Sequence, residues 1–409
     1  DPRELAGLAD ITANLLTRGT TIRSATVIAS ELEGFGGSLE SAAQWDASHV
    51  SVGVMSDKIA PAMEILADVV RRPTFKQNEI ERLRQQYLDN LTLSLDEPRS
   101  IGLFVAARVL YGDDPYGHPL EGTEESLKRI SRADILKLHR LIYRPDNAIL
   151  VIGGDIKTIA GFKLATRYFG DWFKPKTKVP QIPRDSVVLR SGRVVVIDKP
   201  DAGQAAVYLV RRGIERMDPD YYSGIVTNSV LSGYSGRLNQ EIRIKRGLSY
   251  GAGSSLDARR EVGPFVATAQ TKNESAAMVA DLLKSEITRL ASAPIPDSEL
   301  IPRKAALIGE FARELETVNG LVSQVSGLAL YKLNLDELSH YIDRVQGVTS
   351  TDVEKFTAGK LDAKASDIII VGNLKAFLPD LQKRYHDVEV IPFTELDLNT
   401  RLLRKKQPQ

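Results

Sequence analysis

The sequence predicts an α+β protein made of two duplicated α/β sandwich domains, each a mainly antiparallel sheet with helices packed on one face. Three observations predict this fold: a length of 409 residues, a composition of 43% hydrophobic and 26% charged residues without low-complexity runs, and similar elements in the same order in both halves. Because single domains usually hold about 100–200 residues, the chain is too long for one ordinary core. We therefore expect two domains, each with its own interior.

The clearest break between the halves is KPKTKVPQIPRDS, residues 174–186, which holds three prolines and four basic residues. Prolines and clustered charges interrupt periodic structure and are typical of a surface linker. We predict an N-terminal domain over 1–173, a linker over 174–186 and a C-terminal domain over 187–409.

An amphipathic helix is predicted over 57–71, where the apolar residues on one stripe are Ile59, Met63, Leu66 and Val70. Residues 274–290 repeat this design, and Met278 follows Met63 by 215 positions. The glycine stretches FGGS at 35 and YGAG at 250 are separated by the same offset. This common order favours an internal duplication over chance similarity between two α/β halves.

Buried strands are predicted where Ile/Val runs end at a turn residue. NAILVIGGDI at 147 and SDIIIVGNL at 366 are such a pair, and further strands are expected at HVSVGVM, AAVYLVRRG and GPFVATAQT. The second half has RVVVIDKP and AAVYLVRRG before its first helix, whereas the first half starts almost directly on a helix at Asp1, without a Met or a signal-like segment. We expect that further residues precede Asp1 in the full protein.

Several classes of function are disfavoured by composition. Lys and Arg total 54 against 53 Asp and Glu, so charge does not indicate nucleic-acid binding. No apolar run approaches the roughly 20 residues that cross a bilayer, so we expect no membrane span. Cysteine is absent, which excludes disulfides, thiolate zinc sites and cysteine nucleophiles.

The helix predicted in GLADITANLLTRGT places Asp10, Ala13 and Asn14 on one face, at i, i+3 and i+4. A zinc-binding helix would have ligands and a base at this spacing. None of the five histidines has another within five residues, so no H-x-x-E-H or H-E-x-x-H pair exists; they are His49, His118, His139, His340 and His386.

The chain resembles the pitrilysin/insulinase-type metallopeptidases, which include mitochondrial processing peptidase. The resemblance rests on GLADITANLLTRGT, RSATVIASELEGFGGSLESAAQWDASHVSV, EIERLRQQYLDNL, DDPYGHPLEGTEESLKRI and YRPDNAILVIGGD, in this order. It implies the inverted zinc motif H-x-x-E-H on the first helix, with two His ligands and a Glu base, and a third ligand, a Glu, on a later helix.

Set against this motif, Asp10 and Asn14 occupy the positions of the histidines, and Ala13 occupies that of the base. The spacing of about 76 residues that the resemblance implies leads from Asn14 to Asn90, at the border of the inner stripe of its helix. Zinc needs imidazole and carboxylate donors, and hydrolysis needs a base for the bound water. We therefore predict a degenerate metal site and no zinc in this chain, the alternative being a misaligned helix and a zinc site built from other histidines.

In RIKRGLSYGAGSS, Arg243 and Tyr250 are seven residues apart and match an Arg/Tyr pair that family members present toward the cleft opposite the zinc. The resemblance implies that they hydrogen-bond the scissile carbonyl and the oxyanion it becomes, since both are donors. Arg237 lies in GYSGRLNQEI, where Gly233 and Gly236 permit close backbone approach, and it is expected to contact substrate or to have a structural role.

The resemblance therefore implies a non-zinc subunit of a heteromeric metallopeptidase, inactive alone, whose homologous partner holds the zinc. It is similar to the zinc-less partner of bacterial two-chain members and to the non-catalytic subunit of mitochondrial processing peptidase. The periplasm is the expected compartment because many two-chain bacterial members are exported, with the cytoplasm as the alternative. The main alternative function is an inert structural or peptide-binding scaffold, like respiratory-complex core subunits. An independent hydrolase is disfavoured because no pair of neighbouring histidines is present.

Overall fold

The computed structural model describes residues 1–180 and 191–405, and the chain divides into two compact units. Unit 1 consists of Asp1–Leu91, Pro119–Arg184 and Arg313–Leu335, and unit 2 of Thr92–His118, Asp185–Ala312 and Asp336–Gln409. Of the predicted linker, 174–180 hold no helix or strand, and 181–186 lie outside the described residues. The predicted domains over 1–173 and 187–409, with their linker over 174–186, remain a prediction.

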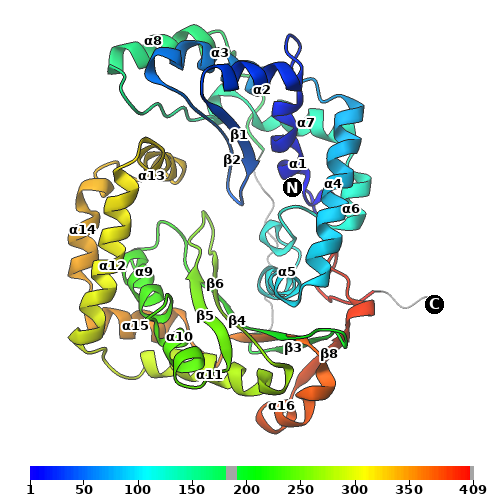
Figure 1. Cartoon of the computed structure of the whole chain (residues 1–409), viewed down its shortest axis with the longest axis vertical. Coiled ribbons are helices and arrows are strands. Elements are labelled where there is room, and N and C mark those ends of the chain that lie inside the picture. Colours follow the sequence, from blue (N-terminus) through cyan, green and yellow to red (C-terminus); the bar gives the residue numbers. More distant parts are fainter. Residues whose placement is uncertain (181–190, 406–409) are drawn as a thin grey trace. The chain divides into compact units, whose positions relative to one another are not determined.

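Unit 1 consists of helices and one hairpin, in which β1 (Ser38–Ala43) pairs antiparallel with β2 (Ser48–Gly53) (Figure 1). The strand predicted at HVSVGVM and the helix predicted over 57–71 are confirmed as β2 and α3. The helices that belong to this unit, wholly or over most of their length, are α1 (Leu8–Leu15), α2 (Ala25–Gly34), α3 (Ile59–Arg71), α4 (Gln77–Asp96), α6 (Glu124–Arg129), α7 (Arg132–Ile142), α8 (Thr158–Phe169) and α13 (Val318–Leu330).

The core of unit 1 fixes the orientation of α1. Leu8, Ile11 and Leu15 follow one another at helical spacing and are buried in one cluster with Ile80 and Leu83 of α4. Burial of these side chains is the main favourable term in holding the two helices together. With that stripe fixed, the neighbouring face of α1 lies against β1, with which α1 makes its most extensive contact.

The strand predicted at 147–156 is wrong. The backbone after Asn147 is extended, but it pairs with no described strand, and Ile149 and Leu150 are 58% and 41% exposed. The corresponding run in the second half forms β7 (Asp367–Gly372), which has ladder partners on both sides. An apolar extended run becomes a buried strand when neighbours satisfy its N–H and C=O groups, and the described part of unit 1 provides no such neighbour.

Unit 2 is built on a six-stranded sheet in the order β5-β6-β4-β7-β3-β8. The strands are β3 (Val194–Asp198), β4 (Ala205–Arg212), β5 (Ser249–Leu256), β6 (Pro264–Thr271), β7 and β8 (Val388–Pro392). The strands predicted at RVVVIDKP, AAVYLVRRG, GPFVATAQT and SDIIIVGNL are confirmed. The sheet is mixed, because β3 runs parallel to both β7 and β8 whereas the pairs β4–β6, β4–β7 and β5–β6 are antiparallel.

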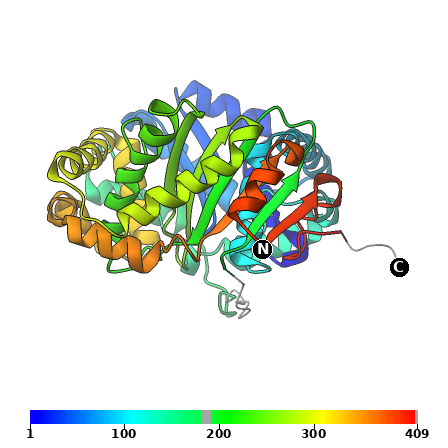
Figure 2. The same cartoon turned by 90° about the horizontal axis from the view of Figure 1, so that it is seen from below.

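Helices cover both faces of this sheet, so the predicted one-sided packing is wrong. Val194 and Val196 of β3 lie in the cluster that includes α9 (Tyr221–Leu231) and α11 (Ala276–Leu290), whereas Val195 and Ile197 lie in the cluster that includes α5. Helix α5 (Pro98–Tyr111) comes from the first half of the sequence but belongs to unit 2. Figure 2 looks toward the other face, with α11 and α16 (Leu378–Arg384) in front of the strands.

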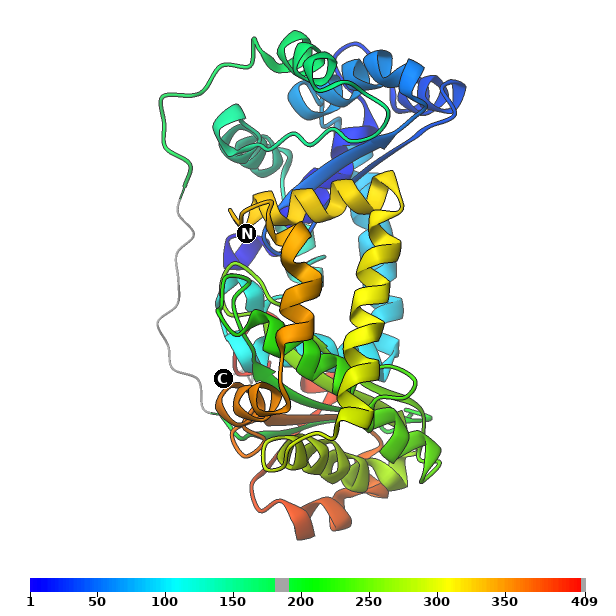
Figure 3. The same cartoon turned by 90° about the vertical axis from the view of Figure 1, so that its left-hand side faces the viewer.

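The remaining helices of unit 2 surround this core. Phe311 of α12 stacks on Tyr341 of α14, with ring centroids 4.0 Å apart, and Figure 3 shows the two helices side by side. None of the described helices combines the length and the apolar character that crossing a bilayer requires. The helices are α9 (Tyr221–Leu231), α10 (Arg237–Asn239), a π-helix (Gln240–Ile244), α11 (Ala276–Leu290), α12 (Asp297–Leu315, of which unit 2 ends at Ala312), α14 (Glu337–Gly347), α15 (Ser350–Lys360) and α16 (Leu378–Arg384).

Candidate functional site

The predicted degenerate metal site lies on α1, where Asp10 and Asn14 face α4 and the hairpin. The carboxylate of Asp10 accepts a hydrogen bond from the Tyr87 hydroxyl at 2.7 Å and another from the Ala43 backbone N–H at 3.3 Å. The Asn14 amide nitrogen donates to Asp10 Oδ1 at 3.2 Å and to the Tyr87 oxygen at 2.9 Å. These three side chains form a closed hydrogen-bonded triad, which we call the Asp10–Asn14–Tyr87 triad.

Burial dominates the electrostatics of this triad. Asp10 is 7% exposed, and burial raises the pKa of its carboxyl above the ordinary value, opposed first by the Tyr87 hydrogen bond. Burial, followed by the negative charge of Asp10, also raises the pKa of the Tyr87 phenol. Burial and the charge of Asp10 raise the pKa of Glu121 as well. The region is therefore unfavourable for negative charge and has no cation within the triad.

The donor set of the triad does not fit a catalytic zinc. Ala13 is fully buried and has no functional side-chain atom, while its backbone oxygen accepts a hydrogen bond from Ser41 at 2.6 Å. Asn14 directs its N–H groups at the acceptors of Asp10 and Tyr87. One carboxylate beside an amide and a phenol lacks the imidazoles of a zinc site and a base for a bound water. We therefore assign no metal chemistry to these residues.

Asn90, the predicted position of the third ligand, is exposed and does not join the triad. Tyr87, three residues earlier on α4, is the residue of this helix that hydrogen-bonds Asp10 of α1. Tyr87 follows Ile80 and Leu83 on the apolar stripe of α4, and this local pattern gives no signal of its polar contact. Its phenol behaves as an amphipathic side chain, with the ring packed against the core cluster and the hydroxyl bonded to polar groups.

The histidines form no alternative site. His139 lies beside Val70, whose carbonyl oxygen is 2.8 Å from Nε2, and burial lowers its pKa. His340 Nδ1 lies 2.8 Å from the backbone oxygen of Asp336, and His118 is buried. Within residues 1–180 and 191–405, no group of three or more His, Cys, Asp or Glu side chains is placed to hold a metal ion.

The other predicted site residues lie in unit 2, where the structure brings Arg243 and Tyr250 together. The Arg243 Cζ atom lies 5.0 Å from the centroid of the Tyr250 ring, and Tyr250 is 90% exposed. Among the described residues, the Arg243 guanidinium makes no hydrogen bond or ion pair. Its N–H donors and the Tyr250 hydroxyl are thus available to a ligand.

Two local irregularities present this pair. Arg243 lies in the π-helix, a form found mostly as single turns at functional sites. Tyr250 lies at a register shift between Ser249 and Ala252 of β5, where Ser249 Oγ accepts a hydrogen bond from the Gly251 N–H at 3.1 Å. Such bulges turn a side chain away from the regular alternation of a strand. β5 also ends the order of described strands, so one of its edges is unpaired within the sheet.

The predicted substrate-binding residues have clear structural contacts. Arg237 forms a bidentate ion pair with Glu299 at 2.7 and 2.8 Å, and this bond raises the pKa of Arg237. Gly233 has φ +84°, which favours glycine, and a Cβ on Gly236 would lie 2.1 Å from the backbone oxygen of Ser232. The loop therefore needs both glycines, and the ion pair favours the structural role for Arg237 over contact with substrate.

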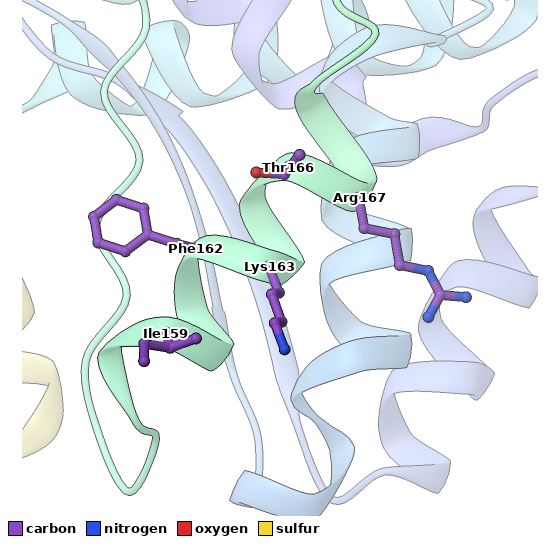
Figure 4. Close-up of a pocket in the computed structure, with 5 residues that line it drawn as sticks. All are labelled: Ile159, Phe162, Lys163, Thr166 and Arg167. Carbon is purple, nitrogen blue, oxygen red and sulfur yellow. The ribbon is translucent and has the colours of Figure 1, made fainter.

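An apolar hollow on unit 1 lies beside α8 and is a poor candidate for catalysis. Figure 4 shows the five side chains that line it, and the exposed Ile159 and Phe162 project on one side of the helix. No carboxylate or imidazole is among them, so they offer no acid, base or metal ligand; they are Ile159, Phe162, Lys163, Thr166 and Arg167.

Comparison with known families identifies a peptidase-like protein. Residues 1–124 match the insulinase family of M16 peptidases, and residues 129–307 match the peptidase M16 inactive domain. The first match contains the triad, and the second contains Arg243 and Tyr250. Together they cover well over half of the chain, which belongs to the peptidase M16 (insulinase) family.

Individual relatives support this membership. The chain is 26% identical over 354 residues to an uncharacterized zinc protease of Mycobacterium leprae, covering 85% of this chain and 79% of the relative. It is 24% identical over 380 residues to an uncharacterized zinc protease of Streptomyces coelicolor, covering 91% and 82%. A crystal structure of a peptidase M16 inactive domain from Pseudomonas fluorescens is similar with a TM-score of 0.82 and 25% identity, covering 90% and 89%. A protease from Helicobacter pylori shares the fold with a TM-score of 0.84 at 19% identity, covering 90% and 91%.

Proposed function

We propose that this chain is the non-zinc subunit of a heteromeric zinc metallopeptidase. In this proposal a homologous partner subunit holds the zinc and the base that activate water. Arg243 and Tyr250 of this chain bind the peptide substrate and stabilise the oxyanion that forms at the scissile carbonyl. The observation that carries the proposal is their placement, 5.0 Å apart with donors not used by the protein, in a chain whose α1 lacks zinc ligands.

The chemistry of the pair suits this role. A guanidinium donates in the plane of its N–H groups and does not lose its charge, and a phenol donates one further hydrogen bond. Donors fixed in advance stabilise the charge that develops on a carbonyl oxygen as water attacks. The unpaired edge of β5, which contains Tyr250, would let an extended peptide add main-chain hydrogen bonds with little demand on its sequence.

The test reconstitutes the complex from this chain and a homologue of the same organism that contains H-x-x-E-H. We expect neither bound zinc nor peptide hydrolysis for this chain alone, and hydrolysis on mixing. Arg243→Ala and Tyr250→Phe should each lower kcat by about 10²–10³, the range for loss of one oxyanion donor. If both variants leave kcat of the mixture unchanged, the proposal fails and the inert scaffold becomes the better explanation.

A matched control is available in the same unit. The Arg216 Cζ atom lies 3.8 Å from the centroid of the Tyr221 ring, so Arg216→Ala removes another Arg–Tyr stack. This variant should leave kcat unchanged. The proposed compartment is the periplasm, and fractionation of cells that express the full-length protein tests it separately.

A further inference from the structure

Arg243 has a second aromatic neighbour that the sequence analysis did not single out. The ring centroid of Tyr234 lies 5.6 Å from Arg243 Cζ, in addition to the Tyr250 ring at 5.0 Å. Tyr234 lies between Gly233 and Gly236 in the GYSG loop and is 72% exposed. A ring this exposed gains little from burial, and its contact with the guanidinium is a cation–π interaction.

The backbone of Tyr234 is held by a buried residue that also reaches β5. Asn239 is 3% exposed and donates from Nδ2 to the Tyr234 carbonyl oxygen at 2.6 Å. The Oδ1 atom of Asn239 accepts a hydrogen bond from the Ala252 N–H at 3.4 Å, two residues after Tyr250. One amide side chain therefore links the loop that presents Tyr234 to the strand that presents Tyr250.

A second anchor comes from α12. Arg303 donates to the Ser232 carbonyl oxygen at 3.4 Å and to the Ser235 hydroxyl, on either side of Tyr234. The positive φ of Gly233 allows the turn between these two contacts. The ring of Tyr234 is thus presented from a backbone fixed at both ends.

Two acidic side chains of unit 2, Glu241 and Glu299, are paired with cations other than Arg243. Glu241 pairs with Lys245 at 2.9 Å and with Arg246, and these contacts lower its pKa, Lys245 having the largest effect. Glu299 is bound by Arg237. Arg243 keeps its charge without a described carboxylate partner, so aromatic stacking replaces an ion pair as the force that orients it.

We propose that Tyr234 is a positioning residue that orients Arg243 for the substrate carbonyl. The proposal rests on the proposed function. A guanidinium stacked on aromatic rings keeps its N–H donors at its edge, so stacking restrains the side chain without consuming a hydrogen bond. An arginine held by an ion pair would instead direct its donors at that carboxylate.

The first test needs no activity. In the isolated chain with ¹⁵N-labelled arginine, the ring currents of the two tyrosines should shift the Arg243 Nε–H resonance, which Arg243→Lys identifies by its loss. Tyr234→Leu should move this resonance toward the value of a free arginine, and Tyr234→Phe should leave it near its original position because the ring remains. An unmoved resonance in Tyr234→Leu would overturn the proposal.

The second test uses the reconstituted complex. Tyr234→Leu should lower kcat about two- to fivefold, the effect of losing an exposed cation–π contact, with little change in KM, and Tyr234→Phe should retain activity. The matched control is Tyr168→Leu, because Tyr168 lies 5.3 Å from Arg167 Cζ in unit 1 and should not affect kcat. Equal losses of kcat in Tyr234→Phe and Tyr234→Leu, or no loss in Tyr234→Leu, would refute the stacking role. If Arg243→Ala leaves kcat unchanged, the proposed function fails, and the catalytic part of this inference fails with it even where the resonance shifts.

Discussion

Removal of the Tyr87 hydroxyl should destabilise the helix pair α1–α4. Tyr87→Phe deletes the bond donated to Asp10 Oδ2 at 2.7 Å and the bond accepted from Asn14 at 2.9 Å. A hydrogen bond to a charged group contributes about 1.5–3 kcal/mol and a neutral one about 0.5–1.5 kcal/mol. Because Tyr87 is partly exposed, we expect a loss near the lower end of the sum, about 2 kcal/mol at neutral pH.

The stability lost in Tyr87→Phe should depend on pH. Burial already raises the pKa of Asp10, and the Tyr87 bond opposes that rise, so Tyr87→Phe should raise this pKa further. An acid whose pKa is higher in the folded than in the unfolded protein binds more protons when folded, and stability then falls as pH rises through the interval between the two values. The difference between Tyr87→Phe and the parent should therefore be smaller near pH 4 than at pH 7.

Urea unfolding, with hydrogen exchange of the α1 amides as a local measurement, checks this expectation. Tyr250→Phe is the control for a tyrosine hydroxyl that contributes nothing to stability, because its side chain is 90% exposed. In a protein that already has Asp10→Asn, the stability loss caused by Tyr87→Phe should be the same at pH 4 and pH 7. A loss that is the same at pH 4 and pH 7 would refute the assigned role of the Asp10 charge.

Two further predictions concern the sheet of unit 2. Burial raises the pKa of Asp367 to about 6, so Asp367→Asn should increase stability above pH 6, by up to about 3 kcal/mol. It should have much less effect near pH 4, where the carboxyl is protonated in the folded state and about half protonated in the unfolded state. Urea unfolding at the two pH values measures this, with the exposed Glu274→Gln as control. A Cβ on Gly102 would lie 2.2 Å from a ring carbon of Tyr208, so Gly102→Ala should cost about 1–3 kcal/mol through overpacking of α5 on the sheet. A thermal-unfolding midpoint equal to that of the parent would contradict the packing assigned to α5.

Local sequence patterns predicted the elements whose periodicity suffices to define them. The stripe that includes Met63 and Leu66 predicted α3, and the run DIIIVG predicted β7, because each pattern specifies which side of the element is apolar. The same kind of run failed at 147–156, since strand formation depends on neighbours that the run itself does not specify. The covering of the second sheet face by α5 was also missed, because it joins residues far apart in the sequence.

The candidate site shows the same limit. The resemblance to the metallopeptidase family predicted that Arg243 and Tyr250 act as a pair, and the structure places the guanidinium against the ring. Local spacing could not predict Tyr87, which lies 73 positions after Asn14 and 77 positions after Asp10 in the sequence. It could not predict Tyr234 either, because the ring of Tyr234 reaches Arg243 from a separate loop. A side chain at a helix border or in a glycine loop has no local signal of the partner that it meets.

The sequence by itself determined the family and the residue types at Asp10, Ala13, Asn14, Arg243 and Tyr250, because these facts depend on residue identity and short spacing. Only the tertiary structure decided that Tyr87 closes a hydrogen-bonded triad with Asp10 and Asn14, and that Arg243 lies beside two rings without an acidic partner among the described residues. The physical reason is that burial and stacking are set by which distant segments the cores bring into contact.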